Sequence, residues 1–148
     1  MRFRFRLESI LRLREKEEED ARLELVRVRS ELQKLEDELR MLENEIERVE
    51  RDFEDRMREG MSGSEIREWE SYMKMLKARR MKKIEEIDRK REEEREKLSV
   101  YLERRKERMA LEKLKEKRFR EFLGEIDRME RKMLDEVAER KHWWSGFE

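Results

Sequence analysis

The sequence of 148 residues has no cysteine, no proline, a single histidine and only four glycines. Without cysteine the chain can form neither disulfides nor thiolate metal sites, a composition compatible with the cytoplasm. The lack of proline and the scarcity of glycine leave long stretches in which nothing interrupts a helix. No apolar run approaches the roughly 18–20 residues of a membrane span or forms the apolar segment of a signal peptide. We therefore expect long helices and no direct insertion into a membrane.

The residues that carry catalytic or metal chemistry are also few. There is no glycine-rich phosphate loop and no nucleophile elbow, and His142 is the only histidine. Glu139 and His142 have the spacing used in di-metal helical bundles, but such bundles need two pairs and two further glutamates. We expect no enzyme activity, no cofactor and no metal. Because 41 basic and 41 acidic residues balance to a net charge of zero, no global field draws nucleic acid either.

Charged residues make up 55% of the chain, and apolar residues recur among them with a seven-residue period. Between residues 21 and 53 the steps alternate between four and three. The stripe consists of Ala21, Leu25, Val28, Leu32, Leu35, Leu39, Leu42, Ile46, Val49 and Phe53. So narrow a stripe needs a partner helix along its whole length, which predicts a coiled coil. The period extends backwards to Leu11 and Leu7, with Arg14 and Glu18 as polar interruptions.

A break at residues 60–64 divides the chain into two predicted helices. Gly60 suits a helix C-terminus, and Ser62 with Glu65 has the spacing of a capping box. We predict a helix over residues 6–59, a turn over 60–64, a helix over 65–142 and an aromatic tail over 143–148. So short a turn makes the helices antiparallel neighbours. The fold class is all-α, a single domain (1–148) formed by an antiparallel coiled-coil hairpin with a longer second helix.

The turn also sets which residues face each other: Phe53 would lie near Ser71, and Leu39 near Glu85. Every residue from 88 to 97 is charged, which predicts a looser seam against the apolar residues 27–36. The second helix extends beyond the first by about 20 residues, or roughly 30 Å. In this arrangement its apolar stripe has no intramolecular partner, which marks a binding surface. The stripe comprises Phe119, Phe122, Leu123, Ile126, Met129, Met133, Leu134 and Val137.

Three further features have alternative interpretations. Trp143, Trp144 and Phe147 form either a disordered end or a docking tail. Trp69 can fill the seam beside Phe53, whereas Tyr72 lies off the stripe and is a better surface residue. The opening Arg-Phe repeat of residues 2–6 is too short for a lone strand, so we expect a frayed or partner-bound arm. Its arginines would lie beside the basic residues 113–120 and could meet nucleic acid or an acidic protein groove, although interleaved glutamates disfavour nucleic acid.

Several of these residues resemble the FliJ family of flagellar export proteins. The opening is similar in Leu7, Glu8, Leu11, Leu13 and the run Glu15-Lys16-Glu17. Further similar features are Leu39-x-Met41-Leu42, the break near Gly60, and the aromatic residues Trp69 and Tyr72. The closing run Met129-Glu-x-Lys132-Met133-x-Asp135-Glu136-x-Ala138 matches the end of the family's pattern. The resemblance covers nearly the whole chain.

The resemblance implies an antiparallel hairpin similar to the coiled coil of the rotary-ATPase γ subunit. The end with both termini would enter the pore of the FliI ATPase hexamer, and the region toward the turn would contact the export gate FlhA. Export chaperones are further implied partners. The implied location of the protein is the cytoplasm, peripheral to the inner membrane at the flagellar base. The ring-binding residues would be Phe119, Phe122, Leu123, Ile126, Met129, Met133 and Val137. The gate-binding residues would be Leu42, Tyr72, Leu76, Glu38 and Val49.

This resemblance implies a non-enzymatic stalk that couples ATP turnover in the FliI ring to the export gate. Leu42 and Val49 are also seam positions, so they cannot be both buried and available, and Tyr72 is the better candidate. Two alternatives remain: a structural coiled coil that pairs with a second copy of itself, and a stalk of a virulence-type secretion system. A chaperone escort without ATPase contact is a further possibility.

Overall fold

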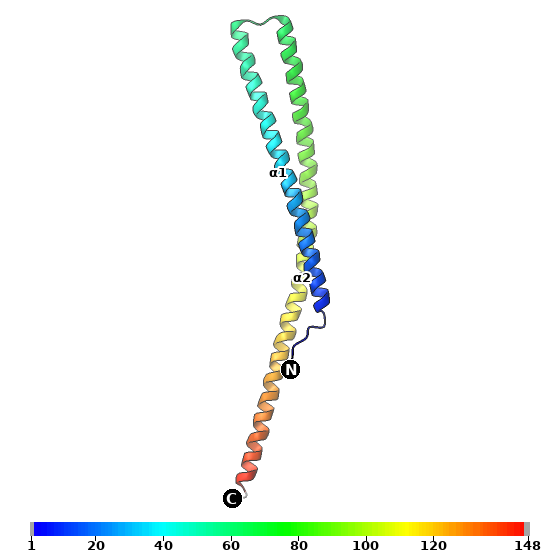
Figure 1. Ribbon diagram of the computed structural model, residues 1–148, viewed down its shortest axis with the longest axis vertical. Coiled ribbons are helices and arrows are strands. Elements are labelled where there is room, and N and C mark those ends of the chain that lie inside the picture. Colours follow the sequence, from blue (N-terminus) through cyan, green and yellow to red (C-terminus); the bar gives the residue numbers. More distant parts are fainter. Residues whose placement is uncertain (1, 147–148) are drawn as a thin grey trace. The chain divides into compact units, whose positions relative to one another are not determined.

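The computed structural model describes residues 2–146, which fall into two compact units treated separately here. Helix α1 (Glu8–Glu59) and helix α2 (Gly63–Ser145) supply nearly all of these residues, and no strand occurs among them (Figure 1). The hairpin unit is Asp20–Leu102, and the terminal unit combines Met1–Glu19 with Glu103–Glu148. In both units α1 packs antiparallel to α2, so the predicted all-α antiparallel hairpin is confirmed. Its assignment as a single domain stays a prediction.

The turn of the hairpin unit follows the chemistry of its residues. Gly60 adopts a φ of 102°, and its N–H donates to the carbonyl of Arg56 at 2.9 Å, which ends α1. The hydroxyl of Ser62 accepts a hydrogen bond from the backbone N–H of Glu65 at 3.1 Å, which caps α2. The turn is shorter than predicted, because α2 begins at Gly63 rather than Glu65.

The apolar core of the hairpin unit lies close to this turn. Ile46 and Val49 of α1 pack against Met73 and Leu76 of α2, and all four side chains are buried. Leu42 and Trp69 pack against this cluster. The indole of Trp69 stacks on Phe53 with ring centroids 3.8 Å apart, so the predicted place of Trp69 in the seam is confirmed. Each fully buried side chain of this size contributes about 1.5–3 kcal/mol to the free energy of folding, so the cluster is a major source of stability for the unit.

Farther from the turn, the apolar stripe of α1 stays buried, although the facing residues of α2 are almost all charged. Val28 has no exposed surface, and Leu25 and Leu32 are 3% and 8% exposed. They lie opposite the wholly charged residues 88–97, whose Lys90, Glu93 and Glu94 are themselves half-buried. The aliphatic stems of such side chains can cover apolar surface while the charged ends reach water. The looser seam that we expected is therefore not found at Val28.

Ion pairs between the helices repeat at the coiled-coil period. Lys83, Lys90 and Lys97 pair with Glu38, Glu31 and Glu24 at 2.7, 2.7 and 3.6 Å. From one pair to the next both partners move by seven residues. Our register placed residue 38 opposite residue 86, whereas it pairs with Lys83. The difference is about one helical turn.

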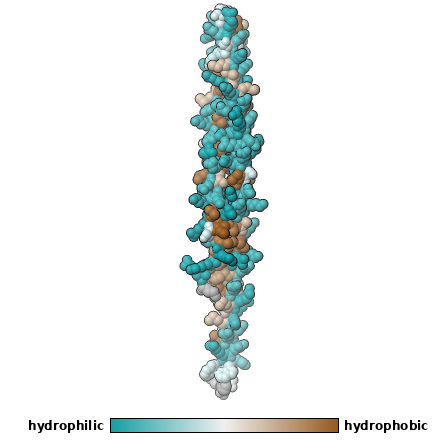
Figure 2. All heavy atoms as spheres, turned by 90° about the vertical axis from the view of Figure 1, so that its right-hand side faces the viewer, coloured by the Kyte–Doolittle hydropathy of each residue, from teal (hydrophilic) through white to brown (hydrophobic). Residues whose placement is uncertain are grey.

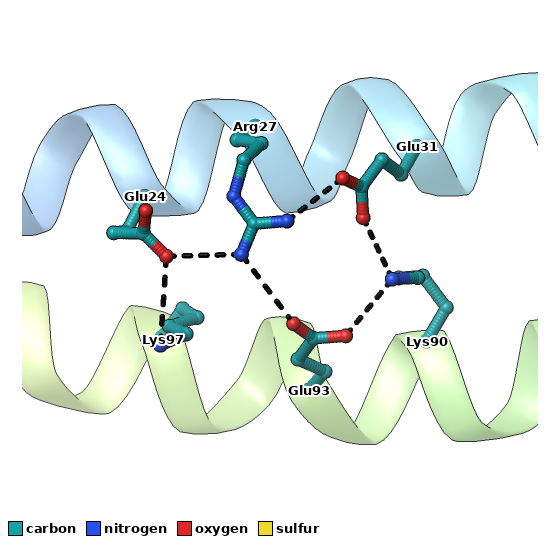
Figure 3. Close-up of polar contacts among 6 residues, drawn as sticks. All are labelled: Glu24, Arg27, Glu31, Lys90, Glu93 and Lys97. Carbon is teal, nitrogen blue, oxygen red and sulfur yellow. Dashed lines mark hydrogen bonds and ion pairs between the residues drawn. The ribbon is translucent and has the colours of Figure 1, made fainter.

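Around Lys90 the pairs close into a network of three cations and three carboxylates (Figure 3). Arg27 contacts Glu24 and Glu31 on its own helix at 3.0 and 2.7 Å, and Glu93 of α2 at 3.7 Å. Lys90 joins Glu31 to Glu93. Hydrogen bonds from Lys90 and then Arg27 lower the pKa of Glu31, and the bonds that Lys90 donates to Glu31 and Glu93 raise its own pKa. The network is neutral and partly exposed, so it selects a register more than it adds stability.

In the terminal unit the seam itself is polar. Leu11 is buried, but the next seam positions are Arg14 and Glu18. The residues of α2 that contact them are charged as well. Arg108 donates to both carboxylate oxygens of Glu18 and to Glu112 at 2.6 Å. The hydrogen bonds to Glu18 are the main cause of the raised pKa of Arg108. A partly buried polar pair of this kind can fix the alignment of two helices at some cost in stability.

A second charged group lies one turn away from this pair. Arg14 and Arg104 both contact Glu17, at 2.9 and 3.6 Å, and both contact Glu107, at 3.6 and 3.5 Å. The buried Oε2 atom of Glu107 accepts no hydrogen bond within the described residues, so these two ion contacts alone balance its charge.

The helix ends differ from the prediction at the two termini. Helix α1 begins at Glu8 rather than residue 6, and α2 continues to Ser145 rather than residue 142. Trp143 and Trp144 are therefore helical and exposed, whereas Phe147 lies outside the described residues. Within residues 2–146 no helix is both long and apolar enough to traverse a membrane.

Candidate functional site

An exposed apolar surface of the terminal unit lies on α2 beyond the start of α1. Glu8, the first residue of α1, pairs with Lys115 at 2.9 Å, so the later turns of α2 have no helix opposite them in this unit. Leu123, Met129, Met133 and Val137 are 47–66% exposed. We call residues 119–137 of α2 the distal stripe. It contains the seven predicted ring-binding residues Phe119, Phe122, Leu123, Ile126, Met129, Met133 and Val137.

The first turn of the distal stripe is not free of partners, which corrects our expectation. Phe3 lies against Phe119 with ring centroids 5.2 Å apart in an edge-on geometry, and against Phe122 at 5.4 Å. Such aromatic pairs add to the stabilisation from apolar burial. The arm before α1 runs on beside α2 (Figure 1), where Phe3 packs its ring against Phe119. Only the stripe from Leu123 onward lacks a cover of this kind.

The arm itself has two sides. The exposure of its residues alternates, with Phe3 and Phe5 half-buried and Arg2, Arg4 and Arg6 exposed. The arm and α2 form a groove whose α2 side includes Leu114, Arg118 and Phe122. A second hollow joins the arm to Lys115. The predicted meeting of the basic arm with the basic part of α2 is thus confirmed for Lys115 and Arg118.

The predicted gate-binding residues lie together in the hairpin unit, with unequal access. Val49 and Leu76 are buried in the core cluster at 9% and 2% exposure, and Leu42 is half-buried against it. Tyr72 is 41% exposed, and Glu38 is half-buried and bonded to Lys83. As the hairpin stands, a partner can reach Tyr72 and Glu38 but not Leu76 or Val49. Their binding role stays a prediction.

Two charged residues of α1, Glu45 and Arg48, lie beside Tyr72. The hydroxyl of Tyr72 donates to Glu45 at 3.3 Å, and Arg48 contacts the same carboxylate at 2.6 Å. The hydrogen bonds from Arg48, assisted by Tyr72, lower the pKa of Glu45. The spacing of three between Glu45 and Arg48 was a signal for this pair. The group offers one aromatic ring and balanced charges, a surface suited to binding rather than to chemistry.

Other hydrophobic side chains gather in separate places among hydrophilic ones (Figure 2). Met41 and Met81 of the hairpin unit are 72% and 61% exposed, without a continuous stripe between them. Among residues 2–146 no group of three or more histidine, aspartate or glutamate side chains is arranged to hold a metal ion.

Comparison with known proteins yields one family. The family model described as "Flagellar FliJ protein" matches residues 3–146, nearly the full length of the chain. Searches of curated proteins and of solved structures give no significant match.

Proposed function

The chain belongs to the FliJ family of flagellar export proteins, and from this premise we propose that it is the stalk linking an export ATPase ring to the export gate. The family is a non-enzymatic component of flagellar protein export. The proposed partners are a FliI-like ATPase hexamer, an FlhA-like gate and export chaperones. The proposed location is the cytoplasmic side of the inner membrane, at the flagellar base.

The observation that carries the proposal is the distal stripe. It projects past the start of α1, and its apolar side chains from Leu123 to Val137 have no helix opposite them within the terminal unit. An apolar stripe on a single helix is suited to a partner that surrounds it, as the subunits around a pore would. An off-centre helix in such a pore would contact the subunits unequally and bias their ATP turnover.

The test is ATP hydrolysis by a matched FliI-like ATPase, with and without the protein. We expect stimulation by the native chain, and loss of stimulation after truncation beyond Glu121. The Met133→Glu/Val137→Glu variant should also lose stimulation, because it places two charges on the distal stripe. The matched control is Met41→Glu/Met81→Glu, which makes the same kind of change at exposed residues of the hairpin unit. Full stimulation by the truncated chain would refute pore insertion.

Gate binding has a separate test at Tyr72. The Tyr72→Ala variant should weaken binding to the cytoplasmic domain of an FlhA-like protein and leave the helix content unchanged, since the side chain is 41% exposed. Leu76→Ala should lower the thermal midpoint, because Leu76 is buried. If Tyr72→Ala lowers the midpoint as much as Leu76→Ala and binding follows stability, Tyr72 is a structural residue.

A further inference from the structure

The arm carries a row of cations that its own unit leaves without acidic partners. Arg2, Arg4 and Arg6 are exposed, and none of them forms an ion pair within residues 2–146. The neighbouring cations do: Lys115 pairs with Glu8 at 2.9 Å, and Arg118 contacts Glu121 at 3.8 Å. The groove beside the arm also contains Glu121 and Glu125, but together with Arg118 the three arm arginines leave an excess of positive charge there.

The phenylalanines hold the arm, and with it the three arginines, against α2. Phe3 is held between Phe119 and Phe122, and the carbonyl of Phe5 accepts a hydrogen bond from the N–H of Glu8 at 3.1 Å. Both phenylalanines are half-buried, whereas Arg4 between them and Arg2 and Arg6 on either side are exposed. The segment thus presents three guanidinium groups within five consecutive residues.

We infer that the arm is a docking surface for an acidic helix of a partner protein. On a helix, carboxylates four residues apart lie along one face, so a single acidic helix can meet several of these arginines together. Each guanidinium can accept a carboxylate with two parallel hydrogen bonds. The aromatic and aliphatic side chains of the groove, Phe5, Leu7, Leu114 and Phe122, supply apolar contacts beside the row. This surface meets the distal stripe at Phe119 and Phe122, but its arginines lie outside the stripe, and the inference does not rest on ATPase binding.

The experiment measures binding of the full chain to a fluorescein-labelled, alanine-based helical peptide with glutamates at every fourth position. A second peptide of identical composition distributes its glutamates around the helix. We expect the native chain to bind the one-sided peptide about tenfold more tightly than the distributed one, because only the first can satisfy several arginines together. Added salt should weaken the binding.

Two variants with the same change in charge show where the peptide binds. The Arg2→Gln/Arg4→Gln/Arg6→Gln variant should lose about tenfold in affinity, the combined effect of three exposed ion pairs. The control Arg67→Gln/Arg79→Gln/Lys82→Gln removes three exposed cations from the hairpin unit and should bind like the native chain. Phe3→Ala keeps all the charges but releases the arm, so it should also weaken binding.

Several outcomes would overturn the inference. Equal affinity for the two peptides would mean that the arm attracts charge without recognising a helix. An equal loss in the control variant would mean that binding is not confined to the arm. Tighter binding to phosphatidylglycerol vesicles than to the one-sided peptide, lost in the arginine variant, would assign the arm to a lipid surface instead.

Discussion

Trp69 of α2 stacks on Phe53 of α1 and donates its indole N–H to the backbone carbonyl of Val49, 3.3 Å away. One side chain thus joins the helices by an aromatic contact and by a hydrogen bond to a carbonyl of α1. It lies at the edge of the only apolar cluster of several buried side chains found in the described residues. Because this contact lies close to the turn, it also holds the C-terminal end of α1 against the N-terminal end of α2.

Replacing Trp69 should therefore destabilise the hairpin unit strongly. We expect Trp69→Ala to lower the free energy of unfolding by about 2–3 kcal/mol, somewhat below the range for fully buried tryptophans, because Trp69 is half-buried. The measurement is urea denaturation followed by circular dichroism. Trp144→Ala is the control, since Trp144 is 70% exposed, and its effect should stay within about 0.5 kcal/mol. Equal effects of the two changes would contradict the role assigned to the stacked pair.

Two glycines should respond in opposite ways to alanine. Gly60 has a φ of 102°, which strains any side chain, so Gly60→Ala should destabilise the turn by about 1–2 kcal/mol. Gly124 lies inside α2, and a Cβ there would meet no atom within 4 Å. Gly124→Ala should stabilise the terminal unit by about 0.5–1 kcal/mol through the helix propensity of alanine. Thermal denaturation of both variants beside the native chain gives the sign of each change, and two shifts of the same sign would contradict this account.

The polar seam predicts a non-additive pair of substitutions. Removing one partner, as in Arg108→Leu or Glu18→Leu, takes the cross-helix partner from a partly buried charge and should cost about 1–2 kcal/mol. The estimate is modest because the side chains of Arg108 and Glu18 remain 21% and 16% exposed. The double variant restores an apolar seam and should be at least as stable as the native chain. A double-mutant cycle in urea measures the coupling, and additive losses would show that the two residues act independently.

The ion pairs of the hairpin unit predict a loss of stability in acid. Hydrogen bonds from Arg27, Lys90 and Lys83 lower the pKa of Glu24, Glu31 and Glu38, respectively, below the ordinary value of 4.5. Near and below that pH the unfolded chain binds more protons than the folded chain, so stability falls as the pH falls. The contribution of these carboxylates is fully present above about pH 4.5 and disappears as the pH falls through their lowered values.

A single substitution can test this linkage. Glu31→Gln should lower the thermal midpoint at neutral pH more than Glu43→Gln does, since Glu43 is exposed. Well below pH 4.5 the difference between the two variants should become smaller, because Glu31 loses its charge in the native chain as the pH falls through its lowered pKa. Circular dichroism melts at both pH values provide the comparison. A difference of constant size would show that the charge of Glu31 is not what stabilises the folded state.

The sequence predicted the helices and the turn well because their signals are local. The spacing of Ile46 and Val49 fixes the buried face of α1, and Gly60 and Ser62 fix where the chain reverses. The alignment of the helices was then correct to about one turn. The error arose because the turn is shorter than predicted, since α2 begins at Gly63.

The contacts of the arm and the burial of Val28 could not be predicted in the same way. The arm is too short to have a period that points to its partner, so the place of Phe3 depends on where Phe119 and Phe122 pass it. The complete burial of Val28 depends on the rotamers of long charged side chains on α2, which composition does not encode. For the candidate site, the sequence identified the apolar distal stripe, but the burial of Leu76 emerges only from packing.

The seven-residue step between the pairs Lys83–Glu38 and Lys90–Glu31 also limits how this protein can change in length. Inserting one residue in α1 would rotate all preceding side chains by about 100° and turn Leu25 and Val28 toward water. Seven residues added to one helix alone would keep the stripe inward, but would displace one helix along the other by two turns. Only whole heptads added to both helices at once preserve the seam and every ion pair. Relatives of different length should therefore differ in matched blocks of seven on either side of the turn.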